Sequence, residues 1–310
     1  MKVSVIVPVF AVENFIERCA RSLFSQTLDE IEYIFIDDFS PDNSVDVLQA
    51  VLNNYPNRKS QVRIIRLTEN IGVAAVRRYG IELARGEYVI HCDSDDYVDV
   101  EMYEHMYMEA KMNDSDIVIC DYNITDGFNY NKRISHRLPN DKFILIDKIL
   151  SGRVHSSLCN KLIKRSLYDE SLIYPKGNMR EDLSILIQLL YRAGSVCHLK
   201  RAYYNYYIRS NSSSSVSDDV RIVYAYEQSK LNYDLINNFI LSKDRNHTKS
   251  LAALKLSIKM ALWKLKDNQL KNAMWDDFKL HISVFDLMSM DVPISYKLKC
   301  LFINFQRFFQ

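Results

Sequence analysis

The sequence predicts an α/β protein with a mostly parallel central sheet, helices on both sheet faces and a helical region at the C-terminal end. Two observations predict this class. Short apolar runs alternate with amphipathic helical stripes through the first 120 residues, and acidic residues follow the ends of two of those runs. After residue 215 the pattern becomes helical, with few Gly or Pro residues.

The strand and helix patterns follow one another regularly. Residues 3–9 are apolar and rich in β-branched side chains, which is typical of a buried strand. From Val12 onward, apolar residues recur at i, i+3, i+4 and i+7, as on one face of a helix. This unit then repeats. The predicted strands cover residues 3–9, 33–36, 62–67, 88–92 and 117–120, and the predicted helices cover 12–24, 47–55, 73–84 and 102–112.

Composition narrows the class of protein. The 310 residues are 48% hydrophobic, which is enough for a sizeable core. The 40 Lys and Arg residues nearly cancel the 39 Asp and Glu residues, so no global positive field favours nucleic acid. The six cysteines have no C-x-x-C spacing, which favours a reduced cytosolic interior. No run reaches membrane-spanning length, and we expect a cytoplasmic protein.

Acidic residues follow two of the predicted strands. Asp93, Asp95 and Asp96 come after the fourth strand, and Asp38 ends the second. In open α/β sheets, ligands bind beside the carboxyl ends of the strands, so these side chains are expected on one edge. Carboxylates close together favour Mg²⁺ or Mn²⁺ shared with a substrate phosphate. The alternative is a solvated acidic turn before the next helix.

Six ordered segments identify a resemblance to a known family, the family 2 glycosyltransferases with the GT-A nucleotide-diphospho-sugar transferase fold. The resemblance covers about the first 210 residues. It is carried by S-V-I-V-P-V-F at 4–10, S-L-F-S-Q-T at 22–27, F-I-D-D-F-S-P-D-N-S at 35–44, N-I-G-V-A-A-V-R-R-Y-G-I at 70–81, A-R-G-E-Y-V at 84–89 and D-S-D-D at 93–96. Neither G-x-G-x-x-G after the first strand nor a P-loop is present, which argues against other nucleotide folds.

The resemblance implies a nucleotide pocket. Pro8 and Phe10 would line it, and Asp38 would accept a hydrogen bond from a pyrimidine base, for which UDP is the natural candidate. Arg77 would lie near the base and the diphosphate. Two alternatives remain: Asp38 could cap the second helix, although residues 40–43 are closer candidates, and Arg77 could be a solvated helix arginine.

The resemblance also implies a metal site. Asp95 matches the metal ligand of the D-x-D motif, and Asp93 points to the ribose or sugar side or serves as a second ligand. Ser94 lies between them and is a further expected donor contact. The implied cofactor is Mg²⁺ or Mn²⁺.

Three residues depart from the family pattern. Phe39 replaces the usual Gly of D-D-G-S, Ala11 a usual Asn, and Arg78 the Asn of A-R-N. Because Phe resists positive φ, we expect the turn at Phe39 to be built differently from one that requires Gly.

Downstream, R-E-D-L-S-I-L at residues 180–186 resembles the family's E-D motif at a helix start. The resemblance implies that Asp182, or else Glu181, is the general base of an inverting transfer. The alternative is that the pair only complements the helix dipole. Arg209 precedes a Ser-rich run and would clamp a diphosphate; the equally weighted alternative is a plain linker.

Two domains are expected. Residues 1–215 would form the catalytic domain, with a donor half at 1–122 and an acceptor half at 123–215, and residues 216–310 a helical region. Near the C-terminus, Lys297, Lys299 and Arg307 alternate with Leu and Phe. This pattern suits a helix on the anionic inner face of a membrane, or equally a helix packed on protein.

These expectations describe an inverting glycosyltransferase. It would move a sugar from a nucleotide-diphospho-sugar, with UDP as the expected nucleotide, to a hydroxyl of a glycan or lipid-linked glycan. The alternative is a noncatalytic nucleotide-sugar-binding or scaffold protein. A phosphatase with an Asp-x-Asp nucleophile fits less well, because that motif follows a first strand and here the acids follow the fourth.

Overall fold

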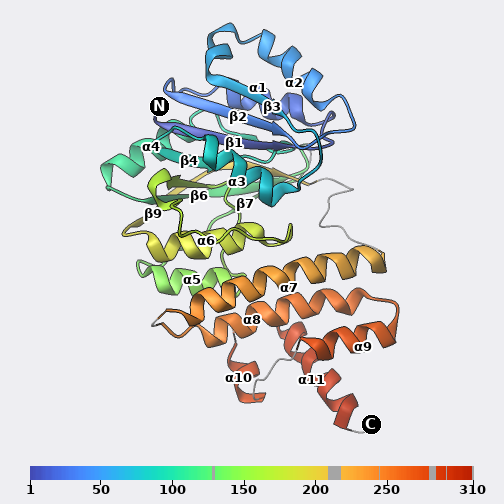
Figure 1. Ribbon diagram of the computed structural model, residues 1–310. Coiled ribbons are helices and arrows are strands. Elements are labelled where there is room, and N and C mark those ends of the chain that lie inside the picture. The colour runs from blue at the N-terminus through green and yellow to red at the C-terminus, as the bar shows by residue number, and fades with distance from the viewer. Residues whose placement is uncertain (128–129, 209–217, 244, 279–283, 291, 309–310) are drawn as a thin grey trace. The chain divides into compact units, whose positions relative to one another are not determined.

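The computed structural model describes residues 1–127, 130–208, 218–243, 245–278, 284–290 and 292–308 (Figure 1). The chain divides into two compact units. The first unit consists of Met1–Asn140, Ser157–Tyr174 and Gln188–Ser210, and the second of Asp141–Ser156, Pro175–Ile187 and Asn211–Gln310. The second unit therefore takes two segments from within the expected residues 1–215. Because compact units need not fold separately, the expected domain boundary stays a prediction.

The first unit is built on one mixed sheet of nine described strands. Eight of them follow the order β3-β2-β1-β4-β8-β6-β9-β5, and β7 pairs with β6. The strands are β1 (Val3–Val9), β2 (Ile31–Asp37), β3 (Val62–Arg66), β4 (Tyr88–His91), β5 (Tyr97–Val98), β6 (Ile117–Thr125), β7 (Asn131–Ile134), β8 (Lys161–Lys164) and β9 (Val196–Tyr207).

Most of the sheet is parallel, as predicted. Strand β1 is parallel to β2 and β4, β2 is parallel to β3, and β6 is parallel to β9. Strand β8 is antiparallel to both β4 and β6, so these two neighbours run in the same direction. All five predicted strands are present, and β5, β7, β8 and β9 are added to them.

Helices cover both faces of this sheet. Alternate β1 residues such as Val5 and Val7 pack in one core with α1 and α2, whereas Ile6 packs with α3 on the other face. The period of two in a strand places neighbouring side chains on opposite faces. The helices are α1 (Ile16–Phe24), α2 (Ser44–Asn53), α3 (Val73–Leu83) and α4 (Met102–Met112). Two short 3-10 helices are η1 (Pro56–Gln61), before β3, and η2 (Arg165–Leu167), after β8.

The second unit is helical in the described residues. Helix α8 packs against α5, α7 and η3, and α10 contacts α11. The helices are α5 (Lys142–Leu150), α7 (Asp219–Leu241), α8 (Thr248–Lys259), η3 (Met260–Lys264), α9 (Asn268–Asp277), α10 (Val284–Ser289) and α11 (Ile294–Phe308), and α6 (Glu181–Arg192) begins in this unit. Across the described ranges, no helix has the length and apolar character needed to cross a membrane.

Candidate functional site

The acidic loop after β4 carries an ion pair at its first aspartate. Arg77 of α3 donates from Nη2 to Asp93 Oδ1 at 2.8 Å, and the Arg77 side chain is only 9% exposed against 34% for Asp93. The interpretation of Arg77 as a solvated helix arginine is therefore wrong. The guanidinium faces the carboxyl end of β4, where its charge supports an acidic or phosphate-bearing neighbour.

His91 lies at the end of β4 and is 1% exposed, with neither ring nitrogen hydrogen-bonded to any described residue. Burial, and then the charge of Arg77, hold the pKa of His91 well below its usual range. The imidazole is therefore neutral and adds no second positive charge beside Arg77.

Two side chains from other elements fix the loop. Arg18 of α1 donates to the backbone carbonyl of Asp95 at 2.8 Å, and its guanidinium lies 3.8 Å from the ring centroid of Tyr207. The hydroxyl of Tyr204 donates to Asp96, and the backbone N–H of Tyr207 donates to the other Asp96 oxygen at 2.7 Å. Asp96 is thus a buried connection between the loop and β9.

Sequence reasoning did not assign Arg18 a role. It lies outside the apolar stripe of its helix, and its contact with Asp95 joins residues 77 positions apart. Ser94 lies in the acidic loop between the two proposed metal ligands and is 5% exposed. Its expected contact with the donor stays a prediction.

Asp38 joins the end of β2 to the start of α3. Its two carboxylate oxygens accept the backbone N–H groups of Ile71 at 2.7 Å and Gly72 at 2.9 Å, and Asp38 itself is 4% exposed. Asp38 therefore binds the loop that leads into α3 and does not cap α2. Burial raises the pKa of Asp38 despite these two hydrogen bonds, which favour the charged form. Each oxygen has a second lone pair, so a further donor can be accepted.

The turn at Phe39 corrects the sequence-based expectation. Phe39 adopts a φ of +61°, and Ala11 adopts +52°, so both take the left-handed conformation that Gly favours. Asp37 Oδ1 accepts the N–H of Ser40 at 3.0 Å, and Ser40 Oγ accepts the N–H of Ala11 at 3.3 Å. These bonds hold both residues in the strained conformation, so the Gly-type turn is retained with a Phe side chain.

Three large apolar side chains belong to residues beside Asp38 or beside its hydrogen-bond partners, and they remain exposed. Phe10 is 48% exposed, Phe39 58% and Ile71 40%. Phe10 follows β1, Phe39 follows Asp38, and Ile71 is the residue whose N–H binds Asp38. Exposed aromatic faces beside a buried acceptor suit a flat heterocycle such as a nucleobase. Sequence reasoning named Phe10 but gave Phe39 and Ile71 no such role.

Pro8 lies in a central strand without breaking the sheet. The Ile6 carbonyl accepts from the Cys92 N–H, so Ile6 faces β4, and Pro8 two residues later faces the same side. Strand β4 ends at His91, which pairs with Ile6. Strand β4 has already ended opposite Pro8, so the missing N–H of Pro8 removes no hydrogen bond between the two strands. Pro8 therefore lies beside the acidic loop.

The predicted base belongs to the second unit. Glu181 and Asp182 form the first turn of α6 and are half-buried. The preceding loop is fixed by buried Asn232 of α7, whose Nδ2 donates to the carbonyls of Gly177 and Met179 at 2.8 Å each. Arg180 has a φ of +64° and donates to Ser257 at 3.3 Å. The roles of Asp182 and Glu181 stay predictions, and Arg209 lies outside the described residues.

The residues after β4 fit a divalent cation only in part. Within the described ranges, no group of three or more His, Cys, Asp or Glu side chains is placed to hold a metal. Asp93 and Asp95 offer hard oxygen ligands, and one Asp93 oxygen is engaged by Arg77. Mg²⁺ is commonly held by one or two carboxylates together with substrate phosphates. The chemistry of these donors fits a cation that a diphosphate completes.

Comparison with known proteins identifies the class. The family model described as Glycosyl transferase family 2 matches residues 4–172, more than half of the chain. EpsH of Bacillus subtilis (strain 168) is 33% identical over 218 residues, covering 68% of this chain and 62% of EpsH. The chain belongs to glycosyl transferase family 2. It spans less than two thirds of the length of EpsH.

Solved structures agree on the fold. Residues 1–349 of S. aureus TarS, in complex with UDP-GlcNAc, superpose with a TM-score of 0.67 at 20% identity, covering 94% of this chain and 84% of that chain. The mannosyltransferase PcManGT from Pyrobaculum calidifontis, in complex with GDP-Man and Mn²⁺, gives 0.59 at 15% identity, covering 89% and 75%. The predicted GT-A fold with a C-terminal helical region is confirmed.

Proposed function

We propose that the protein is an inverting glycosyltransferase that uses a nucleotide-diphospho-sugar donor, with UDP as the nucleotide. One observation carries the proposal: Asp38, Arg77 and Asp93 gather at the carboxyl ends of β2 and β4, where this class of sheet binds ligands. Asp38 would accept the N3–H of uracil, with Pro8, Phe10 and Ser94 as further contacts. The UDP-GlcNAc complex of TarS supports this choice of nucleotide.

Asp95, with Asp93, would hold Mg²⁺ or Mn²⁺, as the Mn²⁺ complex of PcManGT supports. When bound, such a cation neutralises the charge that builds up on a departing diphosphate. Arg77 supplies a fixed positive charge next to Asp93. If Arg209 also contacts the diphosphate, a guanidinium fork suits that task.

The acceptor hydroxyl must lose a proton as it attacks the anomeric carbon. Asp182 is the proposed acceptor of that proton, and Glu181 is the second candidate. A carboxylate in the first turn of α6 is held by the helix and by its positive N-terminal end. The proposed acceptor is a glycan or lipid-linked glycan. The basic and apolar residues of α11 are proposed to contact an anionic membrane that would carry such a lipid.

The test is a donor screen with Mn²⁺. Binding and hydrolysis of UDP-, GDP- and dTDP-sugars are measured for the wild type, Asp95→Asn and Asp182→Asn. We expect UDP-sugars to bind, Asp95→Asn to lose Mn²⁺-dependent binding, and Asp182→Asn to bind normally but turn over at least about 100-fold more slowly. Glu181→Gln tests the second candidate for the general base in the same assay.

Unchanged activity in both variants would overturn the site assignment. Tight donor binding by the wild type without turnover on any acceptor extract would instead support the noncatalytic alternative.

A further inference from the structure

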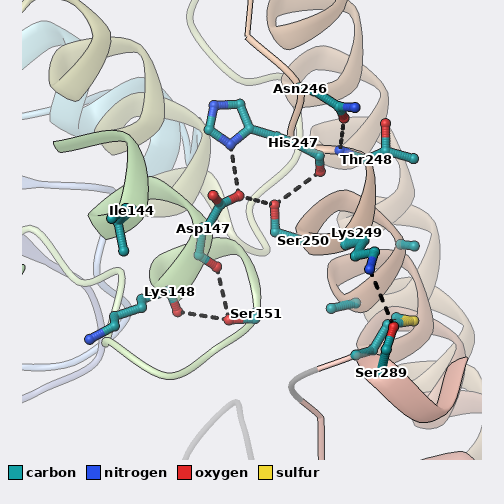
Figure 2. Close-up of a pocket in the computed structure, with 13 residues that line it drawn as sticks. Ile144, Asp147, Lys148, Ser151, Asn246, His247, Thr248, Lys249, Ser250 and Ser289 are labelled. Carbon is teal, nitrogen blue, oxygen red and sulfur yellow. Dashed lines mark hydrogen bonds and ion pairs between the residues drawn. The ribbon is translucent and has the colours of Figure 1, made fainter. Parts of the chain in front are cut away.

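The second unit contains a cavity of about 690 Å³, a volume typical of small-molecule sites. Its wall is formed by α5, the start of α8 and the end of α10 (Figure 2). The proposed catalytic machinery uses none of these residues. The polar residues that line the cavity are Asp147, Lys148, Ser151, Asn246, His247, Thr248, Lys249, Ser250 and Ser289.

Asp147 is held in place at this wall by two buried side chains. His247 Nδ1 lies 2.7 Å from Asp147 Oδ1, and Ser250 Oγ donates to the same oxygen. The His247 side chain is 2% exposed, whereas that of Asp147 is 44% exposed. Figure 2 shows the carboxylate between these two partners. A buried imidazole and a buried hydroxyl thus orient one oxygen, and the carboxylate stays accessible from the cavity.

The remaining polar groups include both donors and acceptors. Lys249 Nζ donates to Ser289 Oγ at 3.4 Å, and Asn246 Oδ1 accepts the N–H of Thr248 at 2.9 Å. Figure 2 shows Lys249 directed toward Ser289 and the Lys148 ammonium directed away from Asp147. Both lysines line the cavity together with Asp147, so its wall carries charges of both signs.

The mixture of positive and negative side chains in the cavity wall favours a neutral, hydroxyl-rich ligand. A phosphate would meet the Asp147 carboxylate, and a metal cation would meet the Lys249 ammonium, so each would face a repulsive charge. A neutral polyol meets no such penalty, because each of its hydroxyls both donates and accepts. Hydroxyl hydrogen bonds to charged groups are also stronger than those to neutral groups. The lining is thus matched to a sugar.

We propose that this cavity binds a saccharide and holds part of the acceptor glycan apart from the donor site. The inference rests on the proposed function, because it takes the glycan to be the acceptor. Asp147 would accept hydroxyl hydrogen bonds, and Lys249 and Ser289 would donate them. The cavity would then retain a glycan chain between transfers without taking part in the chemistry.

The test measures saccharide binding to the full chain without any nucleotide. Maltotetraose, cellotetraose, chitotetraose and galactotetraose are screened by saturation-transfer NMR, and the affinity of any binder is measured by calorimetry. We expect at least one to bind, and Asp147→Ala and Lys249→Ala each to weaken it by about tenfold or more. Lys271→Ala, which replaces a half-exposed lysine on α9 of the same unit outside the cavity lining, should leave the affinity unchanged.

Three outcomes overturn the inference: no saccharide binds the wild type, binding survives both cavity substitutions, or only inorganic phosphate binds. Lys249→Ala keeps the test decisive if Asp147→Ala does not fold, because Lys249 is exposed. UDP binding separates the two proposals. If UDP binds and no saccharide does, only the cavity inference fails; if saccharides bind and no nucleotide does, the donor-site proposal fails.

Discussion

At the scale of single residues, the burial of Arg77 could be predicted from the sequence, whereas its pairing with Asp93 could not. Arg77 follows Ala74 by three residues and precedes Ile81 by four, on the buried stripe of α3, so its burial was open to prediction from helical spacing. Its partner was not. Asp93 lies 16 residues away in a different element, and only the sheet brings the two together.

Replacing Arg77 with Ala should weaken UDP binding in Mn²⁺ by about 10- to 100-fold. A hydrogen bond to a charged group contributes about 1.5–3 kcal/mol, and without Arg77 the carboxylate of Asp93 loses both its charge partner and its orientation. Calorimetry measures the affinity. Arg78→Ala is the matched control, because Arg78 is exposed, forms an ion pair with Glu82 one turn away, worth about 0.3–0.5 kcal/mol, and lies over the Tyr174 ring rather than beside Asp93. Equal affinities in the two variants would refute a role for Arg77 in donor binding.

At the scale of elements, local patterns predicted the strand-helix repeats well. Strands β1 to β4 are apolar runs, and their order along the chain agrees with the predicted alternation. Strand β9 was missed as a strand because it is largely half-exposed, and its register with β6 shifts near Asp121. Strand β8 was missed because its four residues begin and end with Lys. Both owe their conformation to pairing with distant strands, which a short window of sequence does not contain.

In the turn after β2, Phe39 adopts a left-handed backbone conformation that its residue type disfavours. Left-handed conformation costs a non-Gly residue about 1–2 kcal/mol, and Phe39 is 58% exposed, so little burial offsets it. The offset comes from the hydrogen bonds made by Asp37 and Ser40. Reasoning from the Phe side chain alone led to the wrong expectation, because the bond from Ala11 to Ser40 joins two different loops.

This account predicts different changes in stability for two substitutions at Phe39. Phe39→Val should lower the free energy of unfolding by about 1–2 kcal/mol, because a β-branched residue tolerates positive φ least. Phe39→Gly should stay within about 1 kcal/mol of the wild type, since relief of strain is opposed by the greater freedom of Gly in the unfolded chain. Urea unfolding measures both.

Phe10→Val is the matched control for that comparison. Phe10 is 48% exposed and is not among the described residues with positive φ. Its substitution should change the free energy of unfolding by no more than about 0.5 kcal/mol. If Phe39→Val and Phe10→Val were equally stable, backbone strain at Phe39 would not be the cause.

For the whole molecule, the family resemblance did not indicate how the chain divides into compact units. The second unit combines residues 141–156 and 175–187 with the C-terminal helices, and the domain boundary expected after residue 215 stays a prediction. Its cavity draws on α5 and α8, whose lining residues are about 100 positions apart, as for Asp147 and His247. Nothing in either segment alone indicates the other.

The C-terminal helix leads to a prediction for the intact protein. In α11, Ile294 is 69% exposed and Leu298 is 60% exposed, four residues apart on one face, with Lys297 beside them. An apolar stripe beside basic residues suits binding at an anionic interface. We expect the protein to sediment with vesicles that contain anionic phosphatidylserine at low salt, and not with purely zwitterionic vesicles or at 1 M salt, where charges are screened within about 3 Å.

The double variant Ile294→Glu/Leu298→Glu should lose this sedimentation, because it places charge on the apolar stripe that would enter the membrane. Both side chains are exposed, so folding should be little affected. Leu241→Glu, at the end of α7 and 72% exposed, is the matched control and should still sediment. If the wild type stays in solution with anionic vesicles at low salt, membrane contact is excluded. If the double variant instead changes the oligomeric state in sedimentation velocity, the stripe is a protein interface, the alternative that its sequence left open.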